Sequence, residues 1–246
     1  MLQRYYKKWM LIVAIPAWVA IGFYIAQMIT LGLIWVITRF VSLELINEAV
    51  LNSTISAFVY LITTLIVIGL PWIITKYKTT RAEIGLTELP LWTDIFLAPA
   101  SFIIYIIISA ILILIATKFL PGFDINQVQD IGYRQISKNY EYILAFVSLI
   151  VIVPIIEEIL FRGFLFGKLK KIIPVWAAII ITSVLFGFLH GSWNVGIDTF
   201  ALSVVLCLLR QFTGSIWASI LLHMLKNSIA FYFLFINSSI FDTIIR

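Results

Sequence analysis

The sequence predicts an all-α, polytopic membrane protein, a transmembrane helical bundle with about seven membrane segments (six to eight), one of them short. Of 246 residues, 62% are hydrophobic and only 12% are charged, so too few polar residues remain to cover the surface of a soluble domain. The apolar residues form long unbroken runs, unlike the short alternating segments of a transmembrane barrel. Helices also satisfy every backbone hydrogen bond in lipid, so the chain is expected to cross a bilayer several times.

Seven apolar runs follow one another, and no internal repeat relates them. The first three are each about 20 residues or longer and are expected to span the membrane. The sixth extends only about 12 residues, or about 18 Å of helix, from Asp198 as N-cap to Arg210, so a short helix enclosed by its neighbours is predicted. The runs cover residues 10–38, 50–75, 95–117, 142–166, 172–190, 198–210 and 215–236.

One integral membrane domain is expected, in which residues 1–139 supply N-terminal transmembrane helices and loops and residues 140–246 carry the motifs described below. The start of the chain is basic, but its apolar run is too long for a signal peptide and lacks a small-residue cleavage site. That run is therefore expected to be retained. The single cysteine, Cys207, excludes an internal disulfide and is expected to be a packing residue.

Lysine and arginine clusters predict the orientation, because basic residues in short loops mark the cytoplasmic side of a membrane. Three clusters fall on one side, which places the N-terminus in the cytoplasm of a multi-pass cell-membrane protein. The longest outer loop would cover residues 118–141. The net charge of +5 fits this topology better than nucleic-acid binding. The clusters are Arg4, Lys7 and Lys8; Lys76, Lys78 and Arg81; and Lys168, Lys170 and Lys171.

Two adjacent glutamates stand inside the fourth run, where ionised groups are costly unless they are paired or functional. Glu158 and Arg162 are four residues apart and share a helix face, so they are expected to form an ion pair. Glu157 points about 100° away and is predicted to be a general base. The alternative for Glu158 and Arg162 is a simple interfacial pair that snorkels toward the headgroups.

Both histidines also fall in apolar runs. His223 and Asn227 are four residues apart, as are Phe186 and His190, so each pair is expected on one face of its helix. The runs that carry them are predicted to share one polar pocket with the glutamates. Taken singly, His190 fits a structural hydrogen bond and Asn227 fits a link between helices. Lys226, near this pocket, needs an acidic partner that the sequence does not identify.

These motifs resemble those of the CAAX prenyl protease and bacteriocin-processing (Abi) family of intramembrane endopeptidases. The resemblance covers about residues 140–235, in order and spacing. It implies hydrolysis of a peptide bond by a glutamate-activated water, acting on a membrane-associated peptide or protein that is lipidated or amphipathic. The implied roles are Glu157 as general base, His190 as the group that positions the water, His223 with Asn227 as the oxyanion-stabilising pair, and Glu158 with Arg162 as supporting residues.

A metal is the alternative within this interpretation. Glu157, His190 and His223 would be the zinc ligands, with an open position for water. The chain has no His-Glu-x-x-His helix, so no metal or other cofactor is favoured.

Other classes fit less well. A serine protease would need Ser215 beside His223, but about 12 Å separates them along one helix. An aspartyl protease would need a second membrane aspartate beside Asp198. A non-enzymatic immunity or regulatory scaffold with the same core stays open, and a proton-coupled transporter using Glu157 and His223 is disfavoured because no repeat is present. The sequence does not identify the substrate or the oligomeric state.

Overall fold

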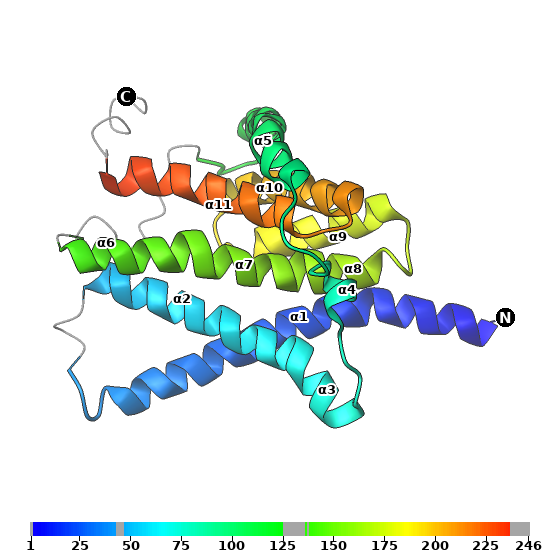
Figure 1. Ribbon diagram of the computed structural model, residues 1–246, viewed down its shortest axis with the longest axis horizontal. Coiled ribbons are helices and arrows are strands. Elements are labelled where there is room, and N and C mark those ends of the chain that lie inside the picture. Colours follow the sequence, from blue (N-terminus) through cyan, green and yellow to red (C-terminus); the bar gives the residue numbers. More distant parts are fainter. Residues whose placement is uncertain (1, 43–46, 125–135, 137, 237–246) are drawn as a thin grey trace. The chain divides into compact units, whose positions relative to one another are not determined.

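The computed structural model describes residues 2–42, 47–124, 136 and 138–236, and all regular elements in these ranges are helices (Figure 1). Six of the described helices are long and apolar enough to cross a membrane, and a shorter apolar helix accompanies them. The predicted fold class is therefore confirmed. The six candidate spans are Trp9–Ile37, Val50–Thr75, Trp92–Phe119, Asn139–Leu169, Trp193–Thr213 and Trp217–Ile236.

Several spans change from α-helical to π-helical turns along their length. These π-helical stretches (η) interrupt the second and fourth spans and end the last span. The elements are α1 (Leu2–Ile37), α2 (Glu48–Thr64), η2 (Leu65–Gly69), α3 (Leu70–Thr75), α4 (Arg81–Ile84), α5 (Trp92–Phe119), α6 (Asn139–Phe146), η4 (Val147–Ile152), α7 (Val153–Glu158), η5 (Ile159–Phe166), α8 (Gly167–Leu169), α9 (Val175–Phe188), α10 (Trp193–Thr213), α11 (Trp217–Phe231) and η6 (Tyr232–Ile236).

The prediction of which segment is short is wrong. The helix α10 has 21 residues and is a candidate span, whereas α9 has only 14. Asp198 does not cap a helix: α10 begins at Trp193 after the N-cap Ser192, and Asp198 lies within it. The prediction that neighbouring helices enclose this segment is confirmed. Half of the apolar stretch of α10 (50%) is buried, which is the largest buried share among the six candidate spans.

The chain forms two compact units. Each unit combines segments from residues 1–139 with segments from residues 140–246. The first unit consists of Met1–Val19, Thr79–Gln129 and Glu158–His223. The second consists of Ala20–Lys78, Asp130–Glu157 and Met224–Arg246. Within the predicted outer loop, residues 125–135 and 137 lie outside the described residues.

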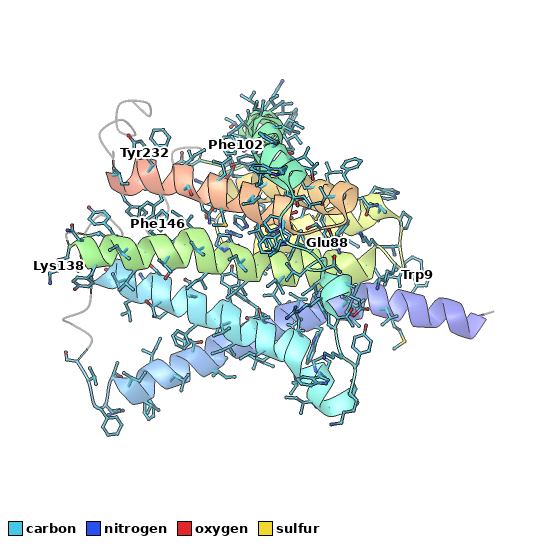
Figure 2. All side chains as sticks on the ribbon, viewed as in Figure 1. Trp9, Glu88, Phe102, Lys138, Phe146 and Tyr232 are labelled. Carbon is cyan, nitrogen blue, oxygen red and sulfur yellow. The ribbon has the colours of Figure 1, made fainter. Side chains whose placement is uncertain are left out.

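In the first unit α10 packs against both α9 and α5, and α9 and α10 run side by side (Figure 1). A buried apolar cluster joins α5, α10 and α11, and Phe102 of α5 packs against it (Figure 2). Asp198 links α10 to α5, because its Oδ1 accepts hydrogen bonds of 2.6 Å from both the Tyr105 hydroxyl and the Ser109 hydroxyl. This carboxylate inside a span is thus bonded to two donors of a neighbouring helix.

A buried arginine fixes the segment around α4 in the same unit. Arg210 of α10 donates hydrogen bonds to the carbonyl oxygens of Gly214 and Glu83. Gly85 has a φ of +82°, and a Cβ there would lie 2.6 Å from the guanidinium carbon of Arg210. Only glycine therefore allows this close approach. Burial lowers the pKa of the nearby Lys170, and the positive charge of Arg210 lowers it further.

In the second unit the core is aromatic and aliphatic. Phe146 of α6 (labelled in Figure 2) meets Phe231 of α11 edge to face, with ring centroids 5.7 Å apart. Ala145, Ile150 and Phe231 are buried in one cluster. The fourth and last spans are thereby packed together within this unit.

Candidate active site

The predicted ion pair between Glu158 and Arg162 is present. Nη1 of Arg162 lies 2.8 Å from Oε1 of Glu158, and both side chains are 0% exposed. The snorkelling alternative is therefore wrong, because a pair that reached toward headgroups would be exposed. Glu158 ends α7 and Arg162 lies in the π-helical η5, so the change of helical register falls between the two partners.

Glu158 also binds a histidine from a distant part of the chain. Nδ1 of His223 in α11 lies 2.9 Å from the same Oε1 that pairs with Arg162. One carboxylate oxygen thus holds a guanidinium and an imidazole together. A carboxylate on one ring nitrogen fixes the orientation of the imidazole and leaves Nε2 as the nitrogen available for chemistry.

Phe186 of α9 lies at the centre of this cluster and is buried. Its ring centroid is 4.8 Å from that of Phe161, 4.9 Å from that of His190 and 6.0 Å from that of His223. The guanidinium carbon of Arg162 lies 4.4 Å from the same ring centroid, which is a cation–π distance. Sequence spacing marked Phe186 only as a motif position, whereas in the structure it contacts every charged or imidazole group of the cluster except Glu158.

His190 does not lie on the helix that was predicted to end with it. The helix α9 ends at Phe188, and His190 follows in a turn. Its Nδ1 lies 2.8 Å from the carbonyl oxygen of Phe186. Because a carbonyl only accepts hydrogen bonds, Nδ1 must carry the proton, and in the neutral ring Nε2 is then an acceptor. Gly191, with a φ of +76°, allows the chain to turn there.

Glu157 belongs to the second unit, and its side chain is only 2% exposed. Tyr60 of α2 belongs to the same unit. The Tyr60 ring also packs against Phe23 of α1, with centroids 5.5 Å apart.

Asn227 makes a link within the second unit. Its Nδ2 donates a 2.9 Å hydrogen bond to the carbonyl oxygen of Leu149 in η4. In this stretch the Val153 amide bonds to the carbonyl of Ser148, five residues back. In the same register the carbonyl of Leu149 would pair with residue 154, which is Pro154 and has no N–H. Asn227 therefore supplies the donor that the proline lacks.

This geometry predicts a conditional effect on stability. Asn227→Leu is expected to destabilise the protein by about 1 to 3 kcal/mol, because the carbonyl of the half-buried Leu149 loses its donor. In a Pro154→Ala background the loss is expected to be smaller, since the backbone regains an N–H there. Unfolding in mixed micelles measures both. If Asn227→Leu lowers the free energy of unfolding equally in the two backgrounds, Asn227 does not compensate for the missing N–H of Pro154.

Cys207 is fully buried, as expected for a packing residue. Among the described residues no group of three His, Cys, Asp or Glu side chains is arranged to hold a metal ion.

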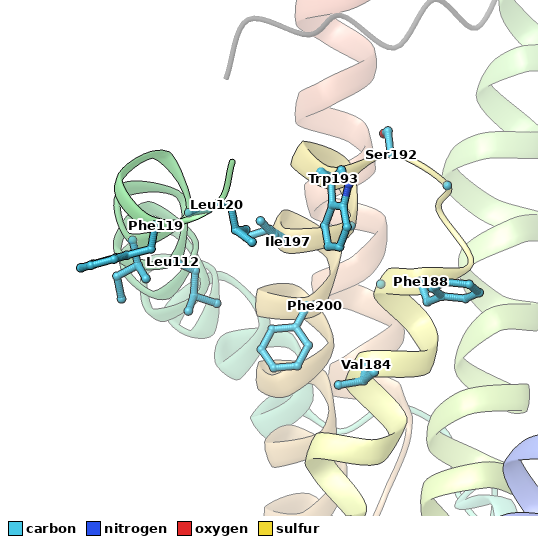
Figure 3. A pocket seen from close by; sticks show the side chains of 14 residues that line it. Leu112, Phe119, Leu120, Val184, Phe188, Ser192, Trp193, Ile197 and Phe200 are labelled. Atoms are coloured by element: carbon cyan, nitrogen blue, oxygen red, sulfur yellow. The ribbon is translucent and has the colours of Figure 1, made fainter. Parts of the chain in front are cut away.

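An apolar pocket of about 770 Å³ is lined in part by Phe188 and Gly191, which flank Leu189 and His190 in the chain. Residues from the C-terminal half of α5, the end of α9 and the start of α10 line it (Figure 3). Gly191 and Ser192, which follow His190, form part of its wall. Val184, Trp193 and Phe200 contribute apolar side chains to the same wall. A hydrocarbon chain fits such a lining better than a polar ligand.

The fold and the cluster define a class of protein, namely a multi-pass helical membrane protein with carboxylate, guanidinium and imidazole groups buried among its apolar helices. Residues 139–229 match the model of a family described as type II CAAX prenyl endopeptidase Rce1-like. This match confirms the resemblance stated from the motifs, and the matched segment contains all six predicted site residues. At the family level it indicates an intramembrane peptidase. Comparison with curated proteins and with solved structures gives no match.

Proposed function

We propose that this chain is an intramembrane endopeptidase. It hydrolyses a peptide bond of a membrane-associated peptide or protein that is lipidated or amphipathic, and Glu157 activates the water. The observation that best supports this function is the sharing of one buried Glu158 oxygen by Arg162 and His223, inside the segment that matches the peptidase family. Such an arrangement fixes an imidazole at membrane depth, where an ionisable group without a function would be a liability.

In the proposed reaction the Glu157 carboxylate removes a proton from water as the water oxygen attacks the scissile carbonyl carbon. His190 accepts a hydrogen bond at Nε2 and so orients the water. The carbonyl oxygen becomes an oxyanion, to which His223 donates from Nε2. In the imidazolium form both nitrogens of His223 donate, Nδ1 to Glu158 and Nε2 to the oxyanion. The C–N bond then breaks, and the proton passes from Glu157 to the leaving nitrogen.

Each donor to the oxyanion contributes about 2.7 to 4 kcal/mol in a site that excludes water. The amide of Asn227 has two N–H groups, and one is used on Leu149. The second N–H is the proposed donor to the oxyanion. Asn227 would then combine a structural bond with a catalytic one. Zinc chemistry is the competing mechanism, and stoichiometric zinc in the purified protein, with cleavage lost on chelation, would replace the general-base proposal.

Replacing Glu157 with glutamine tests the function, because this change keeps the shape and removes the basicity. Membrane-associated peptides from cells with the wild type and with Glu157→Gln are compared by mass spectrometry. We expect a cleaved product in the wild type that is absent in the variant at equal expression. Glu88→Gln, at an exposed position, is the matched control and is expected to cleave normally. A biological effect that survives Glu157→Gln would favour the scaffold alternative.

The apolar pocket lined by α5, α9 and α10 supports the apolar character of the substrate. Val184→Trp places an indole in this pocket and is expected to raise KM for the peptide identified above by roughly 10-fold, with little change in kcat. Ile180→Trp is the matched control, because Ile180 is exposed on the same helix one turn away and does not line the pocket. Equal KM values for the two variants would show that this pocket does not bind the substrate.

A further inference from the structure

We propose that one end of the first unit binds the phosphate group of an anionic phospholipid, with Lys170 as the main contact. This surface, the basic end, consists of residues 80–88, 168–171 and 210–217. The binding does not require the proposed peptidase activity.

Hydrogen bonds and helix packing join the three segments of the basic end. The indole N–H of Trp217 donates a 2.6 Å hydrogen bond to the carbonyl oxygen of Glu88. The ammonium group of Lys170 donates a 3.1 Å hydrogen bond to Oε1 of Gln211. The helix α4 packs against η5, which leads into the segment that carries Lys170 (Figure 1). Segments that are far apart in the chain therefore form one surface.

The basic end has an excess of positive charge. It contains five lysine or arginine residues and two glutamates, and Oε1 of Glu83 is already 3.4 Å from Nζ of Lys171. Arg210 donates to backbone carbonyl oxygens, and Lys170 donates to an amide oxygen. Among the described residues, neither of these two cations has a carboxylate partner. The surface is therefore complementary to an anion. The five cations are Arg81, Lys168, Lys170, Lys171 and Arg210.

Burial makes this excess charge costly. Arg210 is only 4% exposed, and its Nε has no hydrogen-bond partner among the described residues. Lys170 is half-buried, and burial lowers the pKa of its ammonium group, as do the positive charges of Arg210 and Lys171. A phosphate beside Lys170 offsets both effects, because a nearby opposite charge favours the charged form of lysine. Charges removed from bulk water are usually paired in this way.

Two exposed aromatic side chains favour a lipid as the source of the phosphate. Trp176 in the first turn of α9 is 71% exposed, and Phe212 beside Gln211 is 81% exposed. Exposed aromatic rings gather at the headgroup level of membrane proteins. Two candidate spans also end at this surface, one at Leu169 and one at Thr213. The predicted orientation places the surface at the cytoplasmic leaflet, whose lipids are anionic.

The experiment titrates phosphatidylglycerol or phosphatidylcholine into the purified protein in micelles of a non-ionic detergent and measures the melting temperature. We expect a saturable rise with anionic phosphatidylglycerol and no rise with zwitterionic phosphatidylcholine, because a ligand that binds the folded state stabilises it. Lys170→Gln is expected to raise the half-saturating mole fraction of phosphatidylglycerol about 5-fold, the usual contribution of one lysine at an anionic surface. Lys170→Arg keeps the charge and should respond as the wild type does.

Lys118→Gln is the matched control, because it removes the same charge from an exposed lysine at the far end of α5. It should leave the half-saturating mole fraction unchanged. Equal mole fractions for Lys170→Gln and Lys118→Gln overturn the inference, as does a rise in melting temperature that does not saturate. Inorganic phosphate is added without phosphatidylglycerol in a separate arm. If it raises the melting temperature as much as the lipid does, the site binds soluble phosphate and the assignment to a lipid is wrong.

The peptidase proposal is tested separately. Glu157→Gln is expected to lose cleavage and to keep the wild-type rise in melting temperature with phosphatidylglycerol, because Glu157 lies in the second unit, outside the basic end. Loss of that rise in Glu157→Gln, with the variant folded, would contradict a lipid site at the basic end.

Discussion

Glu158→Gln is expected to destabilise the folded protein by about 3 to 5 kcal/mol, because it leaves the buried guanidinium of Arg162 without a carboxylate. Arg162 is 0% exposed, so water cannot replace the lost charge. The same change weakens the acceptor that orients His223, and cleavage should fall even at temperatures where the variant stays folded. Unfolding in mixed micelles and peptide cleavage measure the two effects separately.

Replacing Arg162, the other member of the buried pair, is expected to destabilise the protein less than Glu158→Gln. Arg162→Met leaves Glu158 with the imidazole of His223, which still bonds the same carboxylate oxygen. The double variant Glu158→Gln with Arg162→Met should recover much of the stability lost in Glu158→Gln, since replacing both members of a buried pair is often close to neutral. Cleavage should stay low in the double variant, because His223 still lacks its carboxylate.

An exposed ion pair of the same protein is the matched control. Lys171 and Glu83 form a salt bridge of 3.4 Å with side chains 57% and 27% exposed. Lys171→Ala should change the free energy of unfolding by no more than about 1 kcal/mol, because water and salt screen this pair. Similar losses for Glu158→Gln and Lys171→Ala would show that burial does not set the strength of the inner pair.

Gly187→Ala is expected to separate two helices of the core and to destabilise the protein by about 1 to 3 kcal/mol. A Cβ on Gly187 of α9 would lie 2.6 Å from the backbone oxygen of Gly196 in α10 and 3.3 Å from Cβ of Phe200. Backbone atoms cannot rotate away, so the helices themselves must shift. Close helix packing through small residues is common in membrane proteins.

The same change is expected to reduce cleavage, because Gly187 is the neighbour of Phe186, whose ring contacts Arg162 and both histidines. Gly32→Ala is the control: Gly32 lies inside α1, and a Cβ there would meet nothing within 4 Å. It should be neutral or stabilise the protein by up to about 1 kcal/mol through helix propensity. Equal changes in stability and cleavage for the two variants would show that the close contact between α9 and α10 is not the cause.

Sequence patterns predicted most of the helices and one contact of the site. Long apolar runs have few alternatives to a helix in lipid, so the spans could be predicted to within a few residues. The Glu158–Arg162 pair was also predictable, because both residues belong to one helix and four-residue spacing places them together. Which apolar run was short could not be predicted, because Asp198 resembled a helix cap until α5 supplied Tyr105 and Ser109 as its donors.

The sequence by itself determined the class of protein, most of the helical spans and the set of ionisable groups in the apolar runs, since these follow from composition and from spacing along a single helix. Only the tertiary structure decided that His223 shares a carboxylate oxygen with Arg162 and that Asn227 compensates for Pro154. These contacts join residues far apart in the chain. Their formation depends on how neighbouring helices pack, and local sequence patterns do not predict that packing.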